Sequence, residues 1–252
     1  MSTLRIERDG DILALTITRP EVGNALDLAT LEAIGDAVVA AAHDGTRAIV
    51  IAGVGDRHFC TGLDMKAFAG MASFVDPFGG TRRSLFEIIV ESEVTTIAAV
   101  QGAAFGAGFE LAIACDLIIA GSGASFACPE ARRGMGAQFA SVVLPRLIAP
   151  TLALDMLLTG TPIDATEALR RGLVVTMTSD NVVAVATERA RLIASNAPLS
   201  IRRIRQTVRR SREMPLVAAL RLDEHPNPYE SEDRVEGFRA FVEKRFPVWK
   251  GQ

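Results

Sequence analysis

Two glutamates stand in stretches that are otherwise apolar. Glu110 opens an apolar run of helical character, and Glu130 follows Pro129 directly after a short predicted strand at 125–127. A buried carboxylate without a partner is costly, so such residues tend to be paired or functional. Two carboxyl groups in one site can divide the work of a general acid and a general base. We therefore predict Glu110 and Glu130 as the catalytic pair.

Each glutamate also has a structural interpretation. Glu110 could be a carboxylate that stabilises the start of a helix through the helix dipole. Glu130 could lie in a surface turn and form an ion pair with Arg132 or Arg133. For either residue taken alone, the structural interpretation is slightly favoured, and only their combination with other features supports catalysis.

Two turns rich in small residues could supply backbone N–H groups to a site. In the first, at 59–64, Gly62 permits a tight turn that leaves the N–H of Leu63 pointing outward, and Asp64 can cap a following helix. The second, at 102–108, leads into the helix that carries Glu110, and free N–H groups at a helix start stabilise negative charge. Together they could form an oxyanion hole. The alternative is that both are ordinary connections between elements.

Several other kinds of site are not indicated. Gly106-Ala107-Gly108 begins like a dinucleotide-binding GxGxxG fingerprint, but Leu111 occupies the third glycine position. Cysteines and histidines show no metal-ligand or disulfide spacing, and no Ser/His/Asp arrangement is evident. We therefore predict no metal and no redox cofactor. The residues in question are Cys60, Cys115, Cys128, His43, His58 and His225.

The composition is that of a globular protein. Its 252 residues are 49% apolar and 23% charged, and the net charge of −3 gives no electrostatic case for a nucleic-acid partner. The charged start of the chain lacks the apolar stretch of a signal peptide. The most apolar region, 94–127, is interrupted by Glu110 and Asp116, so we predict a buried core segment and no membrane contact. A reducing cytoplasm is the expected compartment.

Strands alternate with helices through most of the chain, which predicts an α/β fold with a mostly parallel sheet. The apolar periodicity after Asp27 predicts a helix that this residue caps. Gly and Pro punctuation at 68–83 predicts a loop that covers the predicted site. The predicted strands are 4–8, 12–18, 48–52, 97–100, 117–120, 125–127 and 174–177, and the predicted helices are 28–42, 85–92 and 109–115.

The last part of the chain has a helical character. Helical patterns cover 182–195 and 199–211, and a further segment follows at 231–246. We predict a core at 1–195 and a C-terminal helical region at 196–252 that packs on the core or on a neighbouring subunit. Arginines crowd one helix of this region and predict a solvated face, with contacts to nucleotide phosphates or to a neighbour's acidic residues as alternatives. They are Arg202, Arg203, Arg205, Arg209, Arg210 and Arg212.

Taken together, these features resemble the crotonase superfamily, also called the enoyl-CoA hydratase/isomerase family. The strongest part is Gly-Ala-Gly-Phe-Glu-Leu-Ala-Ile-Ala-Cys-Asp at 106–116, followed by Ser125-Phe126 and Pro129-Glu130. Each piece alone is weak, but they occur in the family's order and at its spacing. Supporting pieces are Arg19-Pro20, Asn24-Ala25-Leu26, Thr159-Gly160, Gly172-Leu173-Val174 and the segment 243–247.

The resemblance implies a spiral of repeated β-β-α units and a helical tail that helps to form a homotrimer or hexamer. It also implies an oxyanion hole made by the N–H groups of Leu63 and Ala107. Alanine replaces the usual glycine at 107, but a backbone donor does not depend on the side chain. The family's acyl-CoA site corresponds here to Ala25, Thr61, Asp64, Gly106 and Pro129.

Both glutamates of the family's hydratases are present at the family spacing. This favours an enoyl-CoA hydratase, which adds water across the C2–C3 double bond of a 2-enoyl-CoA; coenzyme A is part of the substrate, and no other cofactor is expected. The turn at 134–141 departs from the usual glycine-rich sequence and is a residue shorter. An isomerase or another enolate-forming enzyme, or a catalytically idle acyl-CoA-binding protein, are therefore the alternatives.

Overall fold

A computed structural model describes residues 2–69, 83–223 and 225–252. The predicted loop over the acyl pocket, 68–83, falls almost entirely outside the described residues. The chain divides into two compact units, Met1–Ala190 and Arg191–Gln252. The division lies within helix α8 (Val182–Ala194), a few residues before the boundary predicted after 195.

A six-stranded sheet forms the frame of the first unit. β1 and β2 pair as an antiparallel hairpin around Asp9, Gly10 and Asp11, and the remaining neighbours are parallel, as the alternation of strands and helices predicts. Its central strands β3 and β5 are buried at every position, which explains their continuous apolar sequences. In sheet order the strands are β1 (Leu4–Asp9), β2 (Ile12–Ile17), β3 (Ala48–Gly53), β5 (Thr95–Val100), β7 (Leu117–Gly121) and β10 (Thr176–Thr178).

A second sheet of four short strands lies in the same unit. β4, β6 and β8 are parallel to one another, and β9 is antiparallel to β8. The predicted turn at 102–108 is wrong in part, because β6 occupies its centre. Three small or aromatic residues are too few to show the alternation that marks a strand in sequence. The strands are β4 (His58–Cys60), β6 (Ala103–Phe105), β8 (Ser125–Ala127) and β9 (Ile163–Asp164).

Three successive turns of the chain have the same plan. Each gives one strand to the large sheet, one strand to the small sheet and then a helix, so the structure confirms the predicted β-β-α spiral. The pairs β3–β4, β5–β6 and β7–β8 are followed by α3 (Leu85–Glu91), α4 (Ala107–Ala114) and α5 (Gln138–Leu147). Before α3 there is also a short helix, α2 (Met65–Ala69).

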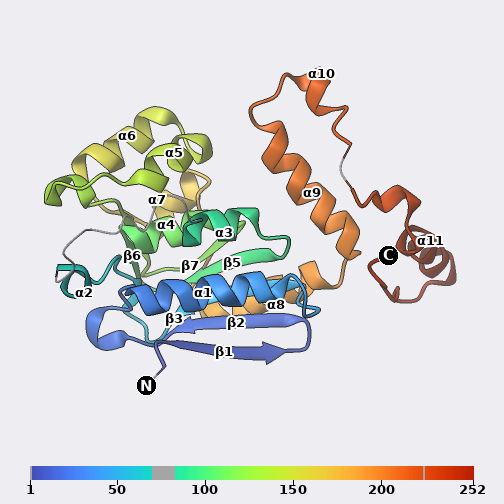
Figure 1. Cartoon of the computed structure of the whole chain (residues 1–252), viewed down its shortest axis with the longest axis horizontal. Helices are drawn as coiled ribbons and strands as arrows, with labels where there is room; N and C mark the ends of the chain where they lie inside the picture. The colour runs from blue at the N-terminus through green and yellow to red at the C-terminus, as the bar shows by residue number, and fades with distance from the viewer. Residues whose placement is uncertain (1, 70–82, 224) are drawn as a thin grey trace. The chain divides into compact units, whose positions relative to one another are not determined.

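The helices close the core around α4. All residues of α4 are buried, and Phe109 packs against Phe126 of β8 with ring centroids 5.8 Å apart. Helix α1 (Leu28–Ala41) begins where the sequence predicts, because the Asp27 side chain accepts from the Thr30 N–H. Figure 1 shows α1 beside the strands of the large sheet and α5 next to α6 (Pro150–Thr159). The unit also contains η1 (Pro20–Val22), η2 (Glu130–Arg133) and α7 (Ala165–Arg170).

The second unit is helical, as predicted. Its helices are α9 (Pro198–Ser211), α10 (Leu216–Ala219), η3 (Pro228–Glu230) and α11 (Glu232–Glu243). Within this unit the indole N–H of Trp249 donates to the Ser195 carbonyl at 2.7 Å, which links the end of the chain to the segment before α9. Across the described chain, no helix combines the length and the apolarity that a membrane crossing requires.

Candidate functional site

The turn after β4 directs the Leu63 N–H away from its neighbouring segment. Leu26 forms a parallel bridge with Leu63: its N–H donates to the Gly62 carbonyl and its carbonyl accepts from the Asp64 N–H, both at 2.8 Å. Successive N–H groups of an extended chain point to opposite sides. The Leu63 N–H therefore points to the side opposite Leu26, and Leu63 is among the residues that line the site cavity.

The first turn of α4 brings a second backbone donor to the same place. Ala107 is the first residue of α4, so its N–H has no acceptor within the helix. Gly106 precedes it with φ 55° and ψ −128°, a conformation that other residues rarely adopt. A methyl group on Gly62 would lie 3.5 Å from the Ala107 nitrogen, which shows how closely the two turns approach.

Gly108 makes this approach possible. A β-carbon at this position would lie 2.0 Å from the carbonyl oxygen of Cys60 at the end of β4. No side chain fits there without moving α4 away from β4. The glycines around α4 therefore serve close packing as well as backbone conformation.

Glu110 is buried in the first turn of α4, with a side chain that is held from a neighbouring helix. The residue is 1% exposed, and Oε1 accepts the Ala140 N–H from the first turn of α5 at 2.9 Å. Burial raises the pKa of Glu110 from 4.5 to about 7, and the nearby charge of Glu130 adds to this effect. The N–H groups of Ala140 and Phe139 oppose it.

Glu130 lies in η2 and is also buried, at 9% exposure, so the predicted surface turn is wrong for this residue. Among the described residues, its Oε2 has no hydrogen-bond partner. Burial raises the pKa of Glu130, while its own backbone N–H and the charge of Arg133 oppose the rise. A β-carbon on Gly106 would lie 2.8 Å from Oε1, which places this carboxyl group over the start of α4.

A cavity of about 320 Å³ collects most of the predicted site residues. The sequence identified six of its lining residues, Thr61, Leu63, Gly106, Ala107, Glu110 and Glu130. The sequence assigned none of the others to the ligand site, although it predicted a tight turn at Gly62 and an ion pair of Arg133 with Glu130. Gly62 and Met65 come from the turn after β4 and the start of α2, and Arg133, Met135, Gly136 and Gln138 come from η2 and the residues that lead into α5.

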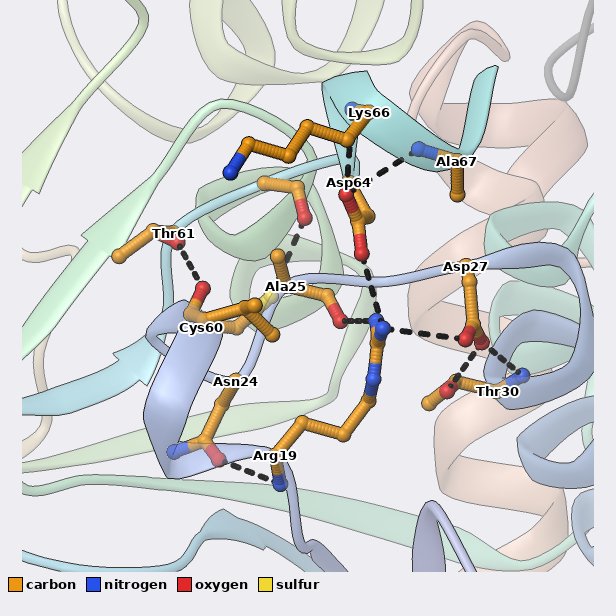
Figure 2. A network of polar contacts seen from close by, with 12 residues as sticks. Arg19, Asn24, Ala25, Asp27, Thr30, Cys60, Thr61, Asp64, Lys66 and Ala67 are labelled. Carbon is orange, nitrogen blue, oxygen red and sulfur yellow. Dashed lines mark hydrogen bonds and ion pairs between the residues drawn. The ribbon is translucent and has the colours of Figure 1, made fainter. Parts of the chain in front are cut away.

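Three residues assigned to the acyl-CoA site by resemblance are not among the lining residues. Ala25 is 6% exposed, and its carbonyl accepts from the Arg19 guanidinium (Figure 2). The carboxylate of Asp64 accepts from Arg19 and from the N–H groups of the following helical turn (Figure 2). Pro129 caps the start of η2 and so orients Glu130.

The cysteines near the site are buried thiols. Burial raises the pKa of Cys60 to about 12 and also raises that of Cys128, so both remain protonated at neutral pH. Within the described ranges, no three His, Cys, Asp or Glu side chains gather where they could hold a metal ion.

The arrangement is suited to chemistry at a carbonyl group. Two converging backbone N–H groups stabilise negative charge that develops on an oxygen. Beside them lie two carboxyl groups whose pKa values are both raised by burial, and such a pair can divide proton uptake and proton release between its members.

Comparisons with known proteins agree with this chemistry. The chain is 39% identical over 260 residues to a carnitinyl-CoA dehydratase of Salmonella typhi, covering 99% of both chains. Its structure is similar to an enoyl-CoA hydratase from Bacillus anthracis, with a TM-score of 0.92, 28% identity and 99% and 100% of the two chains covered. An enoyl-CoA hydratase from Mycobacterium marinum gives a TM-score of 0.91 at 32% identity, with complete coverage of both chains.

The family assignment follows from the whole chain as well as from its site. The sequence pattern of the enoyl-CoA hydratase/isomerase family matches residues 7–252, which include both turns and both glutamates. The solved relatives share the β-β-α spiral that brings these parts together. With two amide donors and two buried carboxyl groups around one cavity, this chain belongs to the enoyl-CoA hydratase/isomerase family of the crotonase superfamily.

Proposed function

We propose that this protein is an enoyl-CoA hydratase, which adds water across the C2–C3 double bond of a 2-enoyl-CoA and catalyses the reverse dehydration. The observation that carries this proposal is the pair Glu110 and Glu130, both lining the cavity that the Leu63 and Ala107 turns also line. A relative named a carnitinyl-CoA dehydratase supports the same class of reaction, since dehydration is hydration in reverse.

In this reaction the thioester oxygen accepts hydrogen bonds from the backbone N–H groups of Leu63 and Ala107. One carboxylate takes a proton from water as the water oxygen bonds to C3, and the C2–C3 π electrons move toward the thioester oxygen to form an enolate. The carboxylic acid of the pair then donates a proton to C2, and the carbonyl is restored. No electrons are gained or lost, so we propose that the reaction needs no redox cofactor. The two N–H groups would polarise the thioester carbonyl, so we propose that no metal is needed as a Lewis acid.

Incubation with crotonyl-CoA tests the proposal directly. Hydration removes the enone, so the absorbance of the conjugated thioester should fall with turnover. The same assay run in reverse with carnitinyl-CoA tests whether this chain shares the substrate named for its relative. If neither thioester reacts while a 3-enoyl-CoA is converted to the 2-enoyl isomer, the hydratase proposal is wrong.

An isomerase is the second candidate, and one contrast in the site favours it. Oε1 of Glu110 is held by the Ala140 N–H, whereas Oε2 of Glu130 has no partner among the described residues. A single unengaged carboxyl group could move a proton between C2 and C4 of a 3-enoyl-CoA. In that case Glu130 alone would be essential. An acyl-CoA-binding protein without activity would bind thioesters and turn over none of these substrates.

We also propose that the acyl-CoA thioester is the physiological ligand. Titration calorimetry with acetyl-CoA and crotonyl-CoA, in buffer that contains a metal chelator, should show saturable binding. Absence of heat and of competition at millimolar ligand would contradict this proposal. The three buried thiols suit a reducing compartment, and on this ground we propose a cytoplasmic location.

We propose further that the protein assembles as a homotrimer or hexamer through its C-terminal helical region. Apolar side chains of the second unit stand exposed, among them Phe238 at 66% and Phe241 at 84%. Exposed apolar patches of this kind mark interaction surfaces. Light scattering should show a mass three or six times that of the chain, and a stable monomer at micromolar concentration would contradict it.

A further inference from the structure

Arg19 is a largely buried cation at the centre of a polar network, and neither composition nor spacing marks it as functional. Its side chain is 14% exposed, and Nη2 lies 2.8 Å from Oδ2 of Asp64 and 3.2 Å from Oδ2 of Asp27. Nη1 donates to the Ala25 carbonyl. Figure 2 shows the guanidinium reaching all three acceptors at once.

These acceptors belong to the two segments that form the Leu63 bridge. Ala25 immediately precedes Leu26, whose N–H and carbonyl bind on either side of Leu63. Asp64 immediately follows Leu63. The guanidinium therefore links Ala25, which precedes one partner of the bridge, to Asp64, which follows the other partner. The side chain of Leu63 is apolar and cannot orient its own backbone by hydrogen bonding.

The backbone of Arg19 is held in place as well. Its N–H donates to Oδ1 of Asn24 at 3.1 Å, and Nδ2 of Asn24 donates to the Val54 and His58 carbonyls at 3.0 and 2.8 Å. Asn24 is fully buried, with a positive φ of 55°. Through Asn24, the backbone of Arg19 is thus anchored to Val54 and to His58 at the start of β4, the strand that leads into the Leu63 turn.

Asp64 is held as an ion by the same network. Arg19 lowers the pKa of Asp64, and the N–H groups of Lys66 and Ala67, which donate to its Oδ1, act in the same direction. Both carboxylate oxygens are engaged by protein donors. This arrangement is suited to holding the turn after Leu63.

We propose that Arg19 is a positioning residue for the oxyanion hole: through Ala25 and Asp64 it fixes the direction of the Leu63 N–H. This inference rests on the proposed use of that N–H to hold a thioester oxygen. A planar guanidinium can bind several acceptors in fixed directions, whereas a lysine ammonium acts as a point charge. Arginine and lysine should therefore not be equivalent here.

The experiment compares Arg19→Lys, Arg19→Gln and Asp64→Asn with the wild type. Kinetics with crotonyl-CoA should show kcat lowered about 10- to 100-fold for Arg19→Gln with a KM changed by about 3-fold or less. This is below the 10²–10³-fold loss for removing an oxyanion donor, because the N–H is misdirected and not deleted. Arg19→Lys and Asp64→Asn should give intermediate losses.

A spectroscopic measurement separates positioning from stability. Bound [1-¹³C]butyryl-CoA, which cannot be hydrated, should show a carbonyl stretch at lower frequency than free ligand, because hydrogen bonds weaken the C=O bond. Arg19→Gln should return part of this shift. The matched control is Arg8→Gln, which removes an exposed ion pair with Asp44 and should leave the carbonyl shift and kcat unchanged.

The outcomes distinguish this inference from the proposed function. Wild-type protein that binds butyryl-CoA without a carbonyl shift would contradict the oxyanion hole itself. A normal wild-type shift that persists in full in every folded Arg19 and Asp64 variant, with kcat unchanged, would overturn the positioning role alone. If Arg19→Gln does not fold, the carbonyl shift of Arg19→Lys and Asp64→Asn decides the question, since both keep polar side chains at these positions.

Discussion

The two units of this chain differ in how far their aromatic side chains are exposed. In Met1–Ala190 the large aromatic residues Phe59, Phe86, Phe109 and Phe126 are almost completely buried. In Arg191–Gln252, Phe238, Phe241 and Phe246 are 66%, 84% and 94% exposed, and helix α9 contains no buried residue. The first unit therefore covers these four aromatic side chains with its own strands and helices, whereas the second leaves its three phenylalanines exposed.

This difference distinguishes the first unit, which holds the candidate reacting groups, from the second unit, which has an exposed apolar surface. A site that must hold two N–H groups and two carboxyl groups in place needs close packing, and the first unit provides it around α4. The second unit has an apolar groove of about 960 Å³, lined by residues such as Ile204, Phe238 and Trp249. Such a groove is suited to being covered by another subunit.

The largest effect should come from the carboxyl pair in the first unit. For a hydratase, we expect Glu110→Gln and Glu130→Gln each to lower kcat by about 10²–10⁴-fold, because an amide keeps the shape but cannot exchange the proton. Binding of butyryl-CoA should remain. Stopped assays with crotonyl-CoA measure the first effect, and calorimetry measures the second.

Glu32→Gln is the control for this pair, since Glu32 is exposed on α1 and should leave kcat unchanged. A severe loss for Glu130→Gln only would favour the isomerase. Full activity in both Glu110→Gln and Glu130→Gln would contradict the catalytic assignment. Melting curves of each variant must show that it is folded.

The packing around α4 can be broken by one methyl group. Gly108→Ala places a β-carbon 2.0 Å from the Cys60 carbonyl oxygen, so we expect the free energy of unfolding to fall by about 3 kcal/mol or more. Gly123→Ala is the matched change, because no atom lies within 4 Å of its β-carbon. Denaturant titration of both variants should show a loss for Gly108→Ala alone. Equal stabilities would mean that the close contact between α4 and β4 is not required.

The burial of Glu110 predicts a pH dependence of stability. Its folded pKa of about 7 exceeds the ordinary 4.5, so the folded state binds more protons between these values, and the stability of the wild type falls as pH rises through them. Glu110→Gln cannot ionise. It should therefore be more stable than wild type at pH 8, by up to about 3 kcal/mol, and similar to it at pH 4. A gain that is the same at both pH values would contradict this explanation.

Substitution of an exposed apolar residue in the second unit should change the stability of the fold little and should instead weaken the assembly of subunits. Phe238→Ser removes an exposed side chain from the groove, so the free energy of unfolding at low protein concentration should change by about 0.5 kcal/mol or less. The mass measured by light scattering should shift toward the monomer. An unchanged assembly state would show that this part of the groove does not join subunits.

Much of the fold was predictable because its signals are local. Apolar runs that match β3 and β5, the hairpin around Gly10 and the cap at Asp27 all depend on neighbouring residues, and the structure confirms them. Within the site, the sequence indicated which groups could react. The types and spacing of Glu110 and Glu130 were readable because carboxyl groups are unusual in apolar segments.

What the tertiary structure decided is how those groups are held. β6 was missed because three residues carry no periodicity, and its pairing with β4 and β8 depends on distant strands. The raised pKa of Glu110 results from burial, and the opposing N–H of Ala140 comes from a helix that follows much later in the chain. The link from Arg19 to Asp64 likewise joins segments that are far apart in sequence. The sequence by itself determined the chemical groups and most local elements, whereas distances, burial and hydrogen-bond partners arise only when distant segments pack together.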